Sequence, residues 1–125
     1  MTSEEFVRVV KLVVEDSAAQ GVKSLLANPP GRKPAEGLLS LSSWYTRLSD
    51  VDRAKADEVI AMAADLATYN FLLMLDGLTR VDEGEPVGRL RLYYERFGET
   101  DHLNSAMDLN DGEFLSSILK SLDPM

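Results

Sequence analysis

The feature that most constrains the fold is an apolar run, VIAMAADLATYNFLLML, at residues 59–75. A helix of this composition is apolar on nearly every side, so it either spans a membrane or is enclosed by the rest of a domain. The run is at the lower length limit for a bilayer, and acidic residues flank it. Asp65 inside hydrocarbon would cost about 2.5 to 3.5 kcal/mol. The run therefore predicts a buried central helix of a soluble domain and no membrane contact.

This central helix is expected over residues 50–78. Ser49 offers a hydroxyl that can accept a hydrogen bond from a free backbone amide at the helix start. Two aspartates follow it in the first turn, where negative charge suits the helix dipole. At the other end, Asp76 and Gly77 are residues that stop helices and form turns.

Two more helices are expected before it. Thr2 and Glu5 have the spacing of a capping box, and an apolar three-four rhythm follows them, so a helix is predicted over residues 3–27. The prolines of NPPGRKPAEG disfavour helical geometry in the residues before them, which makes 28–37 a predicted loop. LLSLSSWYTRL, at 38–48, is predicted to be a short helix.

Residues 89–104, RLRLYYERFGETDHLN, change the period from 3.6 to 2. Leu90, Leu92 and Tyr94 would then face one way, as in a strand with one face on a core and one in water. Gly98 can take the positive φ that a tight connection needs, so a β-hairpin is predicted over this segment. The outward face of its first strand would carry Arg89, Arg91, Tyr93 and Glu95.

A final helix is expected over residues 111–122, because Asn110 and Glu113 repeat the capping-box spacing and a compact apolar stripe follows. Two exposed strands rarely persist alone, so this helix and the central one should cover the leucine face of the hairpin. The predicted fold class is α+β. It is a predominantly helical single domain over 1–125, with a long buried central helix, a β-hairpin near the C-terminus and a final capping helix.

Charge and composition limit the partners. The formal net charge is −8 and the pI is near 4.6. Nucleic acid is not expected as a ligand, because lysine and arginine supply most of the affinity for phosphate. Acidity would speed encounter with a basic protein, such as a toxin or effector, but it also serves simply to keep many cytoplasmic proteins soluble. The chain has no cysteine, and its N-terminus has acids where a secretory signal needs bases, so we expect a cytoplasmic protein without an export signal.

No motif indicates a metal, a cofactor or a catalytic centre. His102 is the only histidine, which leaves any metal site to carboxylates, and it is expected to be a surface residue at the strand edge. DLNDGE, at 108–113, lacks the register of a calcium loop. No nucleophile elbow, phosphate-binding loop or dinucleotide fingerprint is present. We therefore expect no metal, no cofactor and no enzymatic activity.

Two candidate sites remain. The outward residues Arg89, Arg91, Tyr93 and Glu95 are of types that dominate binding energy at interfaces, although alternating arginines also keep a sheet edge from sticking to others. The second candidate is a pocket near Asp65, Tyr69 and Asn70, where an acid on a buried helix can act as a proton donor. Asp65 can equally accept a structural hydrogen bond from a neighbouring side chain.

Three segments resemble a family of small acidic bacterial proteins of unknown function. They are W-Y-x-x-L-S-x-x-D-R at 44–53, L-D-G at 75–77 and L-Y-Y at 92–94. The resemblance covers about two-thirds of the chain. It implies a single intact domain of bacterial type, and it supplies no active site because these motifs carry no known chemistry.

Three functions are compatible with the sequence. The first is a non-enzymatic protein-binding or accessory role, like that of immunity proteins or regulatory partners, carried by the hairpin. The second is a small-molecule-binding or hydrolytic role, with the pocket near Asp65. The third is a structural homodimer formed through the apolar helices.

Overall fold

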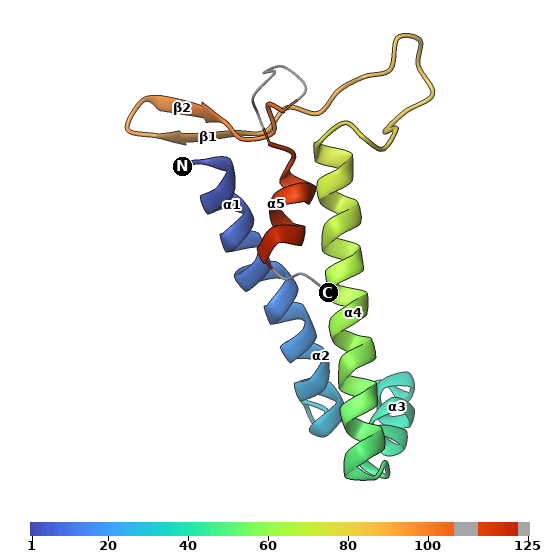
Figure 1. The fold of residues 1–125 in the computed structure, drawn as a ribbon. Helices are drawn as coiled ribbons and strands as arrows, with labels where there is room; N and C mark the ends of the chain where they lie inside the picture. The colour runs from blue at the N-terminus through green and yellow to red at the C-terminus, as the bar shows by residue number, and fades with distance from the viewer. Residues whose placement is uncertain (107–112, 123–125) are drawn as a thin grey trace. The chain divides into compact units, whose positions relative to one another are not determined.

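The computed structural model describes residues 1–106 and 113–122 (Figure 1). Its elements, in chain order, are α1 (Ser3–Val9), the π-helix η1 (Val10–Asp16), α2 (Ser17–Ala27), α3 (Glu36–Thr46), α4 (Asp50–Leu75), β1 (Tyr93–Arg96), β2 (Glu99–His102) and α5 (Leu115–Leu122). The predicted fold class is confirmed. The described chain is α+β and mostly helical, with a two-stranded antiparallel hairpin between a long helix and a final helix.

The chain forms two compact units. Residues 1–12 and 67–125 make one, called here the core unit, and residues 13–66 make the other, called the helical unit. Each is described by itself, and a single domain over 1–125 stays a prediction.

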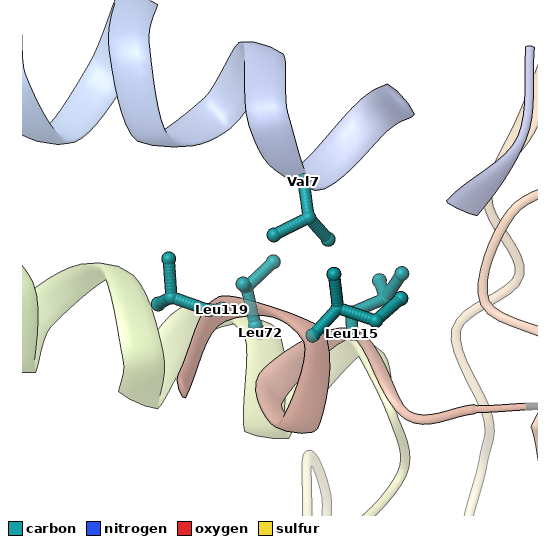
Figure 2. Packing of buried hydrophobic residues seen from close by; sticks show 5 residues of the cluster. Val7, Leu72, Leu115 and Leu119 are labelled. Atoms are coloured by element: carbon teal, nitrogen blue, oxygen red, sulfur yellow. The ribbon is translucent and has the colours of Figure 1, made fainter. Parts of the chain in front are cut away.

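The core unit is organised by five apolar side chains from three helices. Figure 2 shows Val7 of α1 pointing toward Leu72 of α4 and toward the α5 residues Leu115 and Leu119. The α5 side chains recur at the three-four spacing of a helix with one apolar face. Ile118 completes the cluster, and each of the five is at most 4% exposed.

The start of α5 is held by a side chain from the end of α4. Asp76 is 3% exposed, and its carboxylate accepts hydrogen bonds from the backbone amides of Leu115 (2.8 Å) and Ser116 (2.9 Å). The Ser116 hydroxyl donates a third bond, of 2.6 Å. The helix therefore begins at Leu115, after the expected start at 111. The cap predicted at Asn110 lies outside the described residues.

The N-terminus ties α1 to the hairpin. The predicted capping box is confirmed, with the Thr2 hydroxyl and the Glu5 carboxylate each accepting from the other residue's backbone amide. Ser3 Oγ donates to the carbonyl of Leu103 (2.6 Å), and the terminal amine pairs with Asp101 (2.6 Å). Figure 1 shows the N-terminus beside the strands.

In the helical unit, polar ties join neighbouring helices. The buried Ser42 of α3 donates to the carbonyl of Leu26 on α2 (2.6 Å), and Tyr45 donates to the carboxylate of Asp57 on α4 (2.6 Å). That hydrogen bond, then burial and the charge of Asp57, raise the pKa of Tyr45, while the charge of Arg53 acts against them. Ser49 accepts from the backbone amide of Asp52, so the predicted cap of α4 is confirmed.

Several boundaries differ from the expected ones. The helix predicted over 3–27 contains a π-helical stretch, because apolar spacing does not fix whether an amide bonds four or five residues back. The short helix covers Glu36–Thr46 in place of 38–48. The helix α4 ends at Leu75 instead of 78 because Gly77 has φ 77° and forms a Schellman motif with the last turn.

The sequence predicted that α4 is a buried central helix, and this prediction is wrong. Its buried residues are Thr68 and Leu72, both in the core unit. By length and composition α4 could span a membrane, yet only 17% of its most apolar window is buried in the structure. A helix that is apolar on all sides has no single face that must point inward, so its composition predicted burial without predicting what would cover each side.

Candidate functional site: the hairpin and its tip

The hairpin closes through a two-residue turn with an unusual first residue. Arg96 pairs with Glu99, and Phe97 and Gly98 between them have φ values of 52° and 80°. Positive φ at both positions is the type I′ turn that matches the right-handed twist of a hairpin. Asparagine, aspartate or glycine usually occupies the first position, because a bulky side chain there strains the backbone. The predicted positive φ of Gly98 is confirmed, and Phe97 shares that conformation.

Phe97 is also the most exposed large apolar residue in the described chain, at 89%. The guanidinium of Arg96 lies over its ring, 4.8 Å from the centroid. This contact orients the two side chains together at the tip, with the ring left open to solvent.

The two faces of the hairpin differ in their contacts. Tyr93 and Glu95 share one face, and Tyr93 stacks on its cross-strand partner His102, with ring centroids 4.7 Å apart. The opposite face carries Asp101, which pairs with the N-terminal amine. Tyr93 is 49% exposed, so its face of the hairpin is open to a partner. His102 ends β2, but it is half-buried and not the surface residue that was predicted.

The base of the hairpin is organised by the buried side chain of Asn104. Its oxygen accepts from the Leu92 amide (2.7 Å), and its nitrogen donates to the carbonyls of Leu90 (2.9 Å) and Leu75 (2.6 Å). The strand β1 begins at Tyr93, and one further backbone bond, from the Leu103 amide to the Leu92 carbonyl (2.8 Å), lies beyond it. The backbone ladder goes no farther, because the Asn104 side chain takes the Leu92 amide and the Leu90 carbonyl. The expectation that Arg89 and Arg91 belong to the strand is therefore wrong.

The four predicted contact residues are nevertheless exposed, as the alternating pattern indicated. Arg89 and Arg91 precede β1, while Tyr93 and Glu95 lie within it. The expected cover of the leucine face is incomplete: Leu90 is 38% exposed, and Leu92 and Tyr94 are half-buried. At the base of the hairpin, Leu103 is buried, at 3% exposed. Most residues of the two strands are exposed on both faces of the hairpin.

The predicted pocket residues lie one turn apart on α4. Asp65 belongs to the helical unit, whereas Tyr69 and the exposed Asn70 belong to the core unit, where Lys120 Nζ lies 4.5 Å from the centroid of the Tyr69 ring. A cavity of about 400 Å³ in the core unit lies elsewhere, between residues 74–81 and 87–90. The pocket near Asp65 stays a prediction.

Sequence reasoning missed three residues that shape this site. Phe97 could have been found, because a two-residue connection ending in glycine predicts positive φ at both of its positions. Asn104 and Asp76 could not, because their partners lie 12 or more residues away in the chain. Within residues 1–106 and 113–122, no three histidine, aspartate or glutamate side chains are grouped so as to hold a metal ion.

Comparison of the chain with protein-family models, curated proteins and solved structures gave no match. The resemblance to a bacterial family of unknown function stays a prediction.

Proposed function

We propose that this protein is a non-enzymatic protein-binding module whose contact surface is the hairpin tip. The observation that carries the proposal is Phe97, an 89% exposed aromatic ring at a backbone position that favours asparagine or glycine. Left-handed backbone costs a bulky residue about 1 kcal/mol. Such strain is commonly retained where the side chain has a function.

The surroundings of Phe97 support a protein partner. Aromatic residues and arginine dominate binding energy at interfaces, and here Arg96 lies over the Phe97 ring while Tyr93 lies farther along the same strand. A ring at the end of a two-residue turn can enter a pocket that a flat surface cannot reach. The expected partner therefore has an apolar pocket with an acidic group at its rim for Arg96.

The proposal retains the role expected from the sequence, that of an immunity-like or regulatory accessory protein in the cytoplasm. The formal charge of −8 would speed encounter with a basic toxin or effector. Arg89, Arg91, Tyr93 and Glu95 are then the flank of the contact surface, and Phe97 is its centre.

The test compares proteins retained from the native host by the wild type and by Phe97→Asn. The product of the adjacent open reading frame is included as the first candidate partner. Asparagine suits the turn, so this variant removes the ring without unfolding the hairpin. Phe71→Ala, which removes an exposed ring of α4, is the matched control.

We expect Phe97→Asn to weaken the complex roughly 30-fold or more, as truncation of an interface anchor does. The double variant Arg91→Glu, Tyr93→Ala should also weaken it, while Phe71→Ala binds as the wild type does. Equal retention of the same partners by the wild type, Phe97→Asn and the double variant would contradict the proposal.

A further inference from the structure

The outward side of α4 in the helical unit carries a stripe of exposed apolar residues. Consecutive helix residues are 100° apart, so the four exposed large apolar residues of this segment fall within about 80° of one another. They are Val51 (72% exposed), Val59 (59%), Met62 (55%) and Leu66 (54%). Half-buried residues such as Ile60 and Ala64 lie on the other side of the helix.

We propose that a second copy of this chain covers this stripe, so that two α4 helices pair across a two-fold axis. The α4 stripe is defined as Val51, Lys55, Glu58, Val59, Met62 and Leu66. This inference does not depend on the hairpin, which lies in the core unit.

The helical unit exposes more apolar area than the α4 stripe alone, whose four apolar residues present about 200 to 400 Å². Its buried apolar residues are Ala19, Leu26 and Tyr45, whereas eleven of its large apolar residues are at least 41% exposed. At roughly 50 to 100 Å² each, they present about 600 to 1,100 Å² of area. A stable interface takes about 800 Å² from each partner, and obligate homodimers take more. A homodimer of standard size would therefore bury the α4 stripe together with other exposed apolar residues of the helical unit.

The charges on the stripe suit a self-complementary interface. Lys55 and Glu58 are its charged members, and they form an ion pair of 3.2 Å within one chain. A two-fold axis that sets the helices antiparallel brings Lys55 of one copy toward Glu58 of the other. Each positive group then meets a negative one. The dipoles of the two antiparallel helices point in opposite directions, which is also favourable.

A lipid surface is the alternative cover, and the charges of α4 disfavour it. Asp57, Glu58 and Asp65 lie along the segment that would enter the hydrocarbon, and each acid there costs energy. The chain is also strongly acidic, so the anionic surface of a cytoplasmic leaflet would repel it. A second copy carries the same net charge, but it covers the stripe without taking Asp57 and Asp65 into hydrocarbon.

Sedimentation equilibrium of the full chain at micromolar concentration tests the proposal. The variant Met62→Glu places a carboxylate in the middle of the stripe, and Ala61→Glu places the same group on a neighbouring exposed residue about 100° around the helix. Circular dichroism checks that both variants keep their helices. Val59→Glu repeats the test one turn from Met62.

We expect a dimer for the wild type, for Ala61→Glu and for Phe97→Asn. Met62→Glu and Val59→Glu should raise the dimer dissociation constant about 100-fold or more, because each buries an unpaired charge. A monomeric wild type, or equal effects of Ala61→Glu and Met62→Glu, would overturn the proposal. The second arm is flotation of the wild type with vesicles of phosphatidylethanolamine and phosphatidylglycerol. A monomer that binds these vesicles would also overturn the proposal.

Discussion

At the scale of single residues, Phe97 combines a backbone cost with an exposed ring. Its φ of 52° strains the turn, and the contact with Arg96 repays part of that strain. The cost falls on the folded protein alone, since the unfolded chain is free to avoid this conformation. If the ring is retained for binding a partner, its removal should raise the stability of the isolated protein.

The variant Phe97→Asn should therefore raise the free energy of unfolding. Relief of left-handed strain is worth about 1 kcal/mol, and loss of the exposed cation–π contact costs about 0.5 kcal/mol, so the expected gain is about 0.5 kcal/mol. Urea unfolding at neutral pH measures it. A loss of stability in this variant would mean that the ring has a structural role, and the argument from strain would fail.

At the scale of elements, the predictable parts are those with local causes. The caps at Thr2 and Ser49, the long α4 and the position of the hairpin follow from neighbouring residues, and all are confirmed. The start of α5 and the end of the strand ladder do not follow from neighbouring residues, because Asp76 and Asn104 bind segments that are distant in the chain. Sequence periodicity contains no signal for such ties.

The same limit applies to the candidate site. Alternation correctly predicted the exposure of Arg91 and Tyr93, but it could not show that Asn104 ends the ladder between them. The two-residue turn at the tip could be predicted, because Gly98 indicates a connection with positive φ. The sequence pattern does not identify the partner, because the pattern shows which residues are exposed and not which surface they fit.

The tie between α3 and α4 gives an element-scale prediction. Tyr45→Phe removes the hydroxyl that donates to Asp57, and should lower the free energy of unfolding at pH 7 by about 1 kcal/mol. Urea unfolding measures the change. Tyr94→Phe, which removes a hydroxyl from the hairpin, is the control and should cost less.

The pH dependence of that tie has a definite sign. The pKa of Tyr45 is raised by its hydrogen bond to Asp57, by burial and by the charge of Asp57, so the fold favours the protonated phenol. Its contribution is complete below the unfolded pKa of about 10 and is lost as pH rises through the folded pKa. The difference in stability between wild type and Tyr45→Phe should therefore shrink above about pH 10. A difference that grows there would contradict this assignment.

At the scale of the whole molecule, the apolar composition of α4 requires cover on more than one side. The sequence predicted that the rest of the chain would provide it, and the structure leaves Val51, Val59, Met62 and Leu66 more than half exposed. A second copy restores the burial that the composition indicates. We thus assign α4 to assembly and the hairpin tip to recognition of a different protein.

The most direct measurement of this claim is the reactivity of a single thiol on α4. The chain has no cysteine, so Met62→Cys and Ala61→Cys each introduce one unambiguous thiol. The rate of maleimide labelling is followed as the protein is diluted from micromolar to nanomolar concentration. Labelling at Met62→Cys should be slow when the protein is concentrated and speed up on dilution, while Ala61→Cys reacts at a constant rate. A Met62→Cys thiol that reacts equally fast at every concentration would show that nothing covers the α4 stripe.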